Sequence, residues 1–355
     1  MKRIATFTDV VRRLEEAEIP YKILDLGQDA QIIVSAYGGR VLGPFVKEGR
    51  SLSWINEAFL DGKTFRTFVQ NREWNLGGDR FWVAPEHPLF VQERSDFNGT
   101  YSVPDALDPG KYLLAEEEEA VCLKQTVLTP AYESAAPHVM FQIFRQIIRA
   151  GDPLAYLPAE KRPRVQTFGY NHAFMLEHLS ASDGLPLEPW NLLQVHPGGK
   201  FLIPYNDACN FVDYYEPAGE SLTVHDGFAE LMADGYTRYK VAFHTLNTTG
   251  RSVYVNRNEA GLYLIYKQYY NDPANPYCCD PADRPGERGC SLFFYNDNGE
   301  NGAFAEFENS GLTVGKEAGR NKAASTMSHI FFTGEKEELE KLIYLLLDVQ
   351  YNITI

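Results

Sequence analysis

Hydrophobic and polar residues alternate with a period of two along most of this chain. The pattern is typical of β-strands whose two faces meet different surroundings. It is clearest in AVCLKQTVL, HVMFQIFRQIIRA, VQTFGYNHAFMLEHLSA, TRYKVAFHTLN, GLYLIYKQYY and CSLFFYND. Turn residues separate such segments, as in SASDG, NTTG and NDNGENG. The pattern therefore predicts a chain made mostly of β-strands.

Helical spacing of apolar residues is found only near the two ends of the chain. The first helix follows a cap at Thr8 or Asp9 and ends before Pro20. The last helix lies in GEKEELEKLIYLLLDVQ, after a cap at Thr333. Its apolar residues follow the spacing i, i+3, i+4, i+7 and i+8, as Leu339, Leu342, Ile343, Leu346 and Leu347. We therefore expect one short helix at each end of a β-protein.

The length of the predicted strands implies large sheets. Strands and helices do not alternate along the chain, which disfavours a parallel α/β fold. No fixed repeat, low-complexity tract or linker divides the sequence. The sequence therefore predicts a single all-β domain over residues 1–355, with two large packed sheets and short N- and C-terminal helices.

The charge balance narrows the class of partner. The 355 residues include 33 Lys and Arg against 48 Asp and Glu, a formal net charge of −15. Such an acidic surface argues against nucleic acid and anionic membranes as partners. No segment reaches the ~20 apolar residues of a membrane span, and the charged start lacks the apolar region of a signal peptide. We therefore expect a cytoplasmic protein of open oligomeric state, for which a neutral small-molecule ligand is possible.

Three cysteines, Cys278, Cys279 and Cys290, fall in the segment PYCCDPADRPGERGC. Zinc sites need well-spaced thiolates, and two adjacent cysteines are poor geometry for one tetrahedral ion. We therefore expect no metal here, and either free thiols or an incidental disulfide.

The segment WNLGGDRFWVAPEHPLF concentrates residue types that bind polar ligands. In an extended segment Arg80 and Trp82 point to the same side, and they offer a fork of donors and a stacking face. The prolines that follow predict a loop that exposes Glu86 and His87. The alternative is a structural ion pair between Arg80 and Asp79 or Glu86.

Two carboxylates and two histidines are further candidates. In the strand FAEFENSG, Glu306 and Glu308 point to one face, ~7 Å apart, where crowding would raise one pKa and suit proton transfer. The alternative is an exposed strand edge with solvated acids. His196 ends an apolar strand before Pro-Gly-Gly, and His329 in a late strand could face the same cleft.

Several common catalytic motifs do not occur in this sequence. It has no G-x-S-x-G elbow, no G-x-x-x-x-G-K-[ST] loop and no H-E-x-x-H. The remaining candidates are carboxylate, histidine, arginine and aromatic side chains. This set of residues suits recognition of neutral carbohydrate and proton transfer on sugars.

The order of several sequence blocks resembles a bacterial family of galactose-mutarotase-like proteins. These blocks are GGRVLGPF, LSWIN, GGDRFWVAPE, ADGYTRYK and a YND segment followed by FAEFENSG. The resemblance covers most of the chain, from about Gly38 to His329. The resemblance implies the β-supersandwich shared by aldose 1-epimerases and many carbohydrate-active domains.

The same resemblance implies roles for individual residues. Glu306 takes the place of the general base of aldose epimerases, His196 that of the general acid, and Arg80 that of the substrate-binding arginine. The chain departs from the epimerase pattern in lacking the Asn-His pair and the second early arginine. Trp82, Glu86, His87, Glu308 and His329 complete the expected sugar-binding set.

An aldose 1-epimerase-like enzyme would need no cofactor and no metal, since only protons move. Two alternatives stay open. The chain could be a non-catalytic glycan-binding or sugar-sensing protein. It could also be another sugar-active enzyme, a hydrolase or a lyase.

Overall fold

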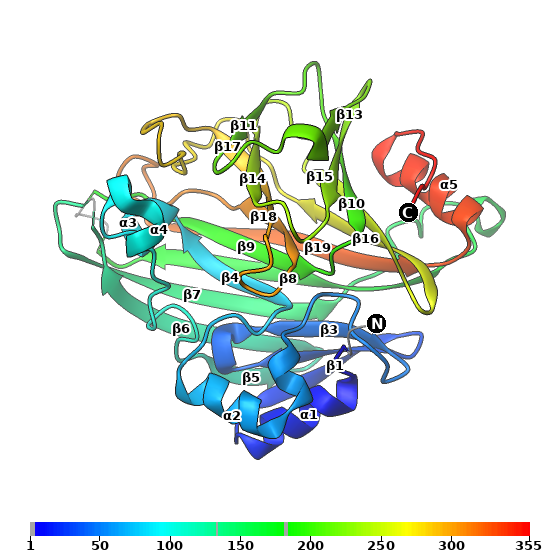
Figure 1. Cartoon of the computed structure of the whole chain (residues 1–355), viewed down its shortest axis with the longest axis horizontal. Coiled ribbons are helices and arrows are strands. Elements are labelled where there is room, and N and C mark those ends of the chain that lie inside the picture. The colour runs from blue at the N-terminus through cyan, green and yellow to red at the C-terminus, as the bar shows by residue number, and fades with distance from the viewer. Residues whose placement is uncertain (1–3, 133, 181–183) are drawn as a thin grey trace.

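The computed structural model describes residues 4–132, 134–180 and 184–355, and two large antiparallel sheets form most of it (Figure 1). The expected turn at SASDG lies partly outside the described residues. The all-β prediction is confirmed. In spatial order, the nine-stranded sheet consists of β1 (Tyr21–Gly27), β2 (Ala30–Ser35), β3 (Val41–Val46), β4 (Asp79–Ala84), β9 (Glu188–Val195), β18 (Ala305–Ser310), β17 (Cys290–Asn296), β14 (Tyr239–His244) and β11 (Phe211–Asp213).

The second sheet has ten strands and stacks against the first. In spatial order it consists of β12 (Leu222–Val224), β13 (Phe228–Ala233), β10 (Gly199–Pro204), β15 (Arg251–Asn258), β16 (Gly261–Tyr269), β19 (Lys322–Thr333), β8 (Gln166–His178), β7 (His138–Arg149), β6 (Ala120–Pro130) and β5 (Leu113–Glu117).

Burial differs between the strands of the two sheets. In β7 every second residue is buried, as expected for a strand with one face on the core and one face on solvent. In β4, β9 and β18 every residue is buried. These central strands of the nine-stranded sheet are therefore covered on both faces, and the face turned away from the core carries the candidate site described below.

Helices cover the ends of the molecule (Figure 1). Near the N-terminus, α1 (Phe7–Glu16) and α2 (Gly62–Gln70) pack over β2 and β3, and α5 (Lys336–Leu347) packs against the ten-stranded sheet. The predicted caps of the terminal helices are wrong. Thr6 caps α1, with Asp9 as its capping-box partner, and α5 begins after Glu335, which makes no side-chain cap. Helix α2 lies in a segment for which no helix is predicted.

The predicted exposed loop at Glu86 and His87 is also wrong. After Pro85 the chain forms a short helix, α3 (Glu86–Phe90), and both side chains are buried. Burial of the Glu86 carboxylate is possible because the Lys240 ammonium and a tyrosine hydroxyl satisfy it. A second short helix, α4 (Phe97–Thr100), follows on the same side of the molecule.

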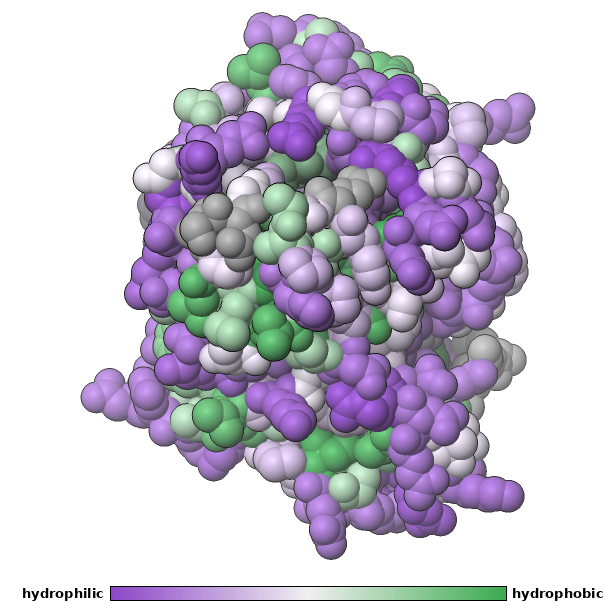
Figure 2. All heavy atoms as spheres, turned by 90° about the vertical axis from the view of Figure 1, so that its left-hand side faces the viewer, coloured by the Kyte–Doolittle hydropathy of each residue, from purple (hydrophilic) through white to green (hydrophobic). Residues whose placement is uncertain are grey.

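The surface on the side of α3 and α4 is largely hydrophilic, with apolar residues in small separate groups (Figure 2). Among the described residues, no helix is both long and apolar enough to cross a membrane. Cys278, Cys279 and Cys290 are free thiols that are buried, and Cys290 starts β17 and is not part of a loop.

Candidate functional site

A cavity of about 1130 Å³ opens on the nine-stranded sheet, on the face turned away from the ten-stranded sheet. The alternation along β4 shows this orientation. Arg80 and Trp82 line the cavity, whereas Phe81 between them contacts the rings of His172 and Phe174 in β8. Strands β4, β9, β18, β17 and β14, helices α3 and α4, and adjoining loops contribute to its wall.

Two carboxylates of β18, Glu306 and Glu308, stand on the floor of this cavity. They are two residues apart on a central strand, so both side chains point to the same face. Both are buried, with 2% and 1% of their surface exposed. A ligand therefore reaches these two carboxylates from the cavity.

Glu306 forms an ion pair with Arg80 that is stacked on tryptophan. The Nη1 atom of Arg80 lies 2.6 Å from Oε1 of Glu306. The guanidinium lies 4.0 Å from the ring centre of Trp82 and 4.9 Å from that of Trp74. Asp108 accepts a hydrogen bond from Nε1 of Trp82 at 2.7 Å, which fixes the indole. Arg80 is thus held between a carboxylate and two aromatic faces.

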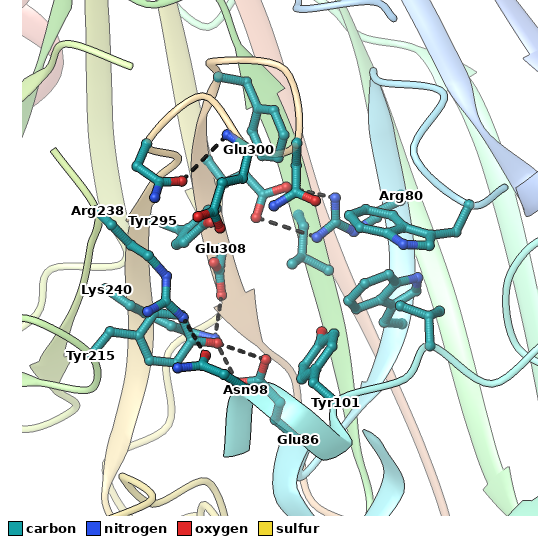
Figure 3. Close-up of a pocket in the computed structure, with 18 of the residues that line it drawn as sticks. Arg80, Glu86, Asn98, Tyr101, Tyr215, Arg238, Lys240, Tyr295, Glu300 and Glu308 are labelled. Carbon is teal, nitrogen blue, oxygen red and sulfur yellow. Dashed lines mark hydrogen bonds and ion pairs between the residues drawn. The ribbon is translucent and has the colours of Figure 1, made fainter. Parts of the chain in front are cut away.

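Glu308 takes part in a similar group on the other side of the floor (Figure 3). The ammonium of Lys240 lies 3.5 Å from its Oε2 atom and 2.9 Å from Oε2 of Glu86. The same ammonium lies 4.5 Å from the ring centre of Trp190, whose Nε1 donates to Glu308 at 3.0 Å. Trp82 and Trp190 are cross-strand partners in β4 and β9. The floor therefore repeats one unit twice: a carboxylate, a cation and an indole.

The two carboxylates share an environment that favours a bound proton. Burial raises the pKa of Glu306 to about 7, with Arg80 opposing and Glu308 adding to the shift. Burial also raises the pKa of Glu308, against the effect of Lys240. Burial disfavours the charge of Lys240, but Glu308 and Glu86 outweigh it and raise the pKa of its ammonium. Near neutral pH one carboxyl can therefore be protonated while Lys240 stays charged.

A loop after β17 forms part of the cavity wall and is built on one buried carboxylate. Asp297 accepts hydrogen bonds from the backbone amides of Gly299 at 2.9 Å, Asn301 at 3.1 Å and Ala303 at 2.9 Å. The hydroxyl of Tyr295 donates to it at 3.1 Å. Because the loop is fixed from within, this part of the wall is formed before a ligand binds.

Five of the eight residues singled out from the sequence line the cavity. They are Arg80, Trp82, Glu86, Glu306 and Glu308. The ion-pair partner of Arg80 is Glu306, and neither Asp79 nor Glu86 takes that place. Period-two alternation was the signal that placed Arg80 with Trp82, and Glu306 with Glu308, on common faces.

The other three residues singled out from the sequence, His87, His196 and His329, are not part of the cavity lining. Nε2 of His196 lies 3.1 Å from the carbonyl oxygen of Ser51, and burial lowers its pKa to about 4. The ring of His87 packs edge-on against Phe97, and its Nδ1 atom lies 3.5 Å from Oδ1 of Asp280. His329 lies between the two sheets. The structure therefore does not bring His196 and Glu306 together in one cavity.

Lys240, Trp190 and Tyr215 line the cavity and are absent from the sequence-based set. The block ADGYTRYK could have indicated Lys240, since alternation places it on the same side as Arg238. A lone lysine or tryptophan in an apolar strand gives no indication of which carboxylate it will meet in the folded chain.

A family model described as a family of unknown function (DUF6786) matches residues 5–354. The chain belongs to this family. A comparison with curated proteins finds no match.

Solved structures show what the fold is similar to. A candidate aldose 1-epimerase from Escherichia coli K12 gives a TM-score of 0.51 at 11% identity, covering 88% of this chain and 99% of that chain. A candidate mutarotase from Salmonella typhimurium gives 0.46 at 11% identity, with coverages of 89% and 91%. Galactose 1-epimerase from Lactobacillus acidophilus NCFM gives 0.39 at 9% identity, with coverages of 89% and 95%. The predicted galactose-mutarotase-like fold is confirmed, and at such identities the likeness concerns the fold alone.

Proposed function

We propose that this protein binds a neutral carbohydrate in the cavity of the nine-stranded sheet and transfers protons at the bound sugar. The observation that carries the proposal is the repeated floor unit of carboxylate, cation and indole. Carboxylates accept from sugar hydroxyls, Arg80 and Lys240 donate to them, and the indoles cover apolar sugar faces. The galactose-mutarotase-like fold supports a sugar as ligand.

The charges of the cavity wall favour a neutral sugar over an acidic one. Each of the four cationic side chains of the lining contacts a carboxylate: Arg72 with Asp105, Arg80 with Glu306, Arg238 with Glu216, and Lys240 with Glu86 and Glu308. Among the residues that the structure describes, the lining contains eight acidic side chains against these four cations. A phosphate, sulfate or carboxylate on the sugar would therefore meet excess negative charge.

The proposed reaction is interconversion of sugar anomers, with Glu306 and Glu308 as the acid–base pair. The ionised carboxylate takes the proton of the anomeric hydroxyl, and the protonated carboxyl gives its proton to the ring oxygen. The bond between the anomeric carbon and the ring oxygen breaks, which leaves an open-chain aldehyde. After rotation about the adjacent carbon–carbon bond, the reverse transfers close the ring with the opposite configuration. Only protons move, so the step needs no cofactor.

In this proposal the second carboxyl takes the role that the sequence resemblance implies for His196. The reason is position. His196 lies outside the cavity lining with Nε2 against a backbone carbonyl, whereas Glu308 lies on the same floor as Glu306.

One observation favours a second candidate function, non-catalytic glycan binding. The short contact between Arg80 and Glu306 favours the ionised carboxylate, and such a pair can hold a sugar without transferring a proton. The two functions differ in whether a bound sugar exchanges its anomers faster.

The test is to follow anomer exchange by NMR for a panel of aldoses, with thermal-shift binding measured in parallel. We expect the wild-type protein to speed exchange of a sugar that stabilises it. Glu306→Gln keeps the shape and should cut turnover by about 10²–10⁴ while binding persists. Glu160→Gln, an exposed glutamate outside the cavity lining, is the matched control.

The outcomes separate the two candidate functions. A sugar that stabilises the protein without faster exchange would leave binding in place and overturn catalysis. A panel in which no carbohydrate stabilises the protein would overturn both.

A further inference from the structure

The residues of the floor line only the inner part of the cavity. At about 1130 Å³ the cavity exceeds the range of roughly 300–1,000 Å³ found for sites of drug-sized ligands. Beyond the floor, the wall continues along Tyr215, Arg238 and Tyr236 to the opening, with Asn98 of α4 facing them. Tyr215 and Arg238 of this outer wall are on the Lys240 side of the cavity, opposite Arg80 (Figure 3).

Exposure increases from the floor to the outer wall. Lys240 is 3% exposed, the side chain of Arg238 is 21% exposed and Tyr236 is 78% exposed. Lys240 is the second residue of β14 and Arg238 directly precedes that strand, two residues away, and both side chains line the same cavity. The lining is therefore continuous from the buried carboxylates to the solvent.

The outer wall is preformed. The guanidinium of Arg238 stacks on Tyr215 at 4.7 Å from the ring centre. Its Nη1 atom lies 2.7 Å from Oε1 of Glu216, and Nη2 donates to Oδ1 of Asn98 at 3.3 Å. Stacking and these two contacts fix the donor fork of Arg238 in the absence of ligand.

One aromatic ring connects the two parts of the cavity. The ring of Tyr215 has Arg238 over it and also Lys240, whose Nζ lies 5.4 Å from the ring centre. The hydroxyl of Tyr215 donates to Glu86 at 2.9 Å. A ligand on the floor therefore shares the Tyr215 wall with whatever occupies the outer part.

The loop that carries Tyr236 is held in shape by one side chain. Oδ1 of Asp234 accepts from the amides of Tyr236 at 2.8 Å and Thr237 at 2.9 Å. Asn296 donates to the same carboxylate at 2.7 Å. The tyrosine ring is thus presented at the opening by a fixed turn, where it can cover the apolar face of a sugar.

We infer that the cavity binds a neutral oligosaccharide of two or more units, with one unit on Glu306 and Glu308 and the next against Tyr215, Arg238 and Tyr236. The inference rests on the proposed carbohydrate binding and adds the size and charge class of the ligand. Arg238 is paired with Glu216, so it serves hydroxyls and does not demand an anionic group. The excess of acidic side chains in the lining disfavours oligosaccharides of uronic acids.

The test is calorimetric titration with glucose, galactose and mannose, with their neutral oligosaccharides of two to four units in α- and β-linked series, and with uronic acid oligosaccharides of the same lengths. For the recognised sugar we expect affinity to rise at least tenfold from one unit to two. Arg238→Ala and Tyr236→Ala should remove most of that increase and leave the affinity for the single sugar within twofold. Arg257→Ala and Tyr156→Ala, at exposed positions outside the cavity lining, are matched controls and should retain it.

The other possible results contradict the length of the ligand, the proposed function or the charge of the ligand. If a single sugar binds and longer chains gain nothing, the oligosaccharide inference is wrong and the proposed function stands. The same holds if the outer-wall variants weaken single and longer sugars equally. If no single or linked sugar binds, the proposed function fails as well. Stronger binding of a uronic acid oligosaccharide than of its neutral counterpart would overturn the charge class.

Discussion

Two clusters of buried charged side chains lie on opposite faces of the nine-stranded sheet. The cavity cluster lies on the outer face of the nine-stranded sheet and consists of Arg80, Glu86, Lys240, Glu306 and Glu308. The interior cluster lies between the two sheets and consists of Asp79, Arg145, His172, Lys267 and His329. Adjacent residues of β4 belong to different clusters, because alternation sends Asp79 inward and Arg80 outward.

The clusters differ in how their charges are balanced. In the cavity cluster three carboxylates surround two cations. The interior cluster has a single carboxylate, Asp79, which accepts from Tyr170 at 3.1 Å and lies 3.7 Å from His172. Lys267 donates to the backbone carbonyl of Phe307, between the two cavity glutamates. Burial keeps the pKa of His172 and of His329 well below the ordinary value, so these rings are neutral.

The comparison teaches that buried charge by itself does not mark a site. The interior cluster is sealed by both sheets, so its contribution is to stability and to the placement of β18. The cavity cluster opens to solvent and can exchange its partners for those of a ligand. Substitutions in the two clusters should therefore separate stability from binding.

The largest effect is expected from Asp79→Ala in the interior cluster. The change leaves Arg145 and Lys267 without their compensating carboxylate and Tyr170 without its acceptor. Breaking a buried charge interaction costs ~3–5 kcal/mol, and we expect a loss of this size in the free energy of unfolding measured with urea. Asp105→Asn, in an exposed ion pair with Arg72, is the control and should cost at most ~1 kcal/mol. Equal losses in the two variants would contradict the sealed interior.

Arg80→Ala in the cavity cluster should affect ligand binding most. Loss of a charged donor costs about 1.5–3 kcal/mol, so sugar affinity should fall at least tenfold. The loss of stability should be smaller than for Asp79→Ala, because water in the cavity can solvate Glu306. Calorimetry and urea unfolding measure the two effects. Affinity within twofold of wild type, together with a stability loss of ~3–5 kcal/mol, would make Arg80 a structural residue only.

Sequence alternation placed residues on faces but did not identify the faces. It grouped Arg80 with Trp82 and Glu306 with Glu308, and each pair lies on the cavity side. It could not show that His329 faces the interior, because a histidine in a strand suits either environment. The wrong prediction of an exposed loop at Glu86 has a similar cause, since burial of Glu86 depends on Lys240, a residue 154 positions away in the chain.

The fold was accessible from the sequence for a different reason. The strand pattern extends over most of the chain, and each segment predicts its own conformation. The cation of each floor unit comes from β4 or β14, whereas both carboxylates come from β18, and only the sheet order brings these strands together. Local pattern therefore predicts elements, and long-range pairing decides the site.

The pH dependence of stability should have opposite signs for Glu306 of the cavity cluster and Lys267 of the interior cluster. Burial raises the pKa of Glu306 from 4.5 to about 7, so in that window the native state keeps a proton that the unfolded chain has lost. Its contribution makes stability fall as pH rises from 4.5 to 7. Burial lowers the pKa of Lys267 from 10.5 to about 7, so there the unfolded chain holds the extra proton. Its contribution makes stability rise as pH increases from 7 to 10.5.

Urea unfolding from pH 5 to pH 10 of wild type, Glu306→Gln and Lys267→Met measures both contributions. Glu306→Gln should lose the falling part and Lys267→Met the rising part, each by at most about 1.4 kcal/mol per pH unit. His172 and His329 titrate in the unfolded chain within the lower window, but they are present in all three proteins and cancel in the differences. Parallel curves for the three proteins would refute both assignments.

The smallest effect is expected from removing one tyrosine hydroxyl that donates to a carboxylate of each cluster. Tyr170 donates to Asp79 in the sealed interior, and Tyr215 donates to Glu86 in the open cavity. An unsatisfied buried acceptor is costly, so Tyr170→Phe should lower the free energy of unfolding by about 1–3 kcal/mol without changing sugar affinity.

In Tyr215→Phe water can replace the lost donor and Lys240 still pairs with Glu86, so stability should change by less than about 0.5 kcal/mol. Its ring still carries Arg238, so binding of a two-unit sugar should persist, whereas Tyr215→Ala should weaken it. A stability loss in Tyr215→Phe as large as in Tyr170→Phe would mean that the cavity is as dry as the interior, and the contrast between the two clusters would then fail.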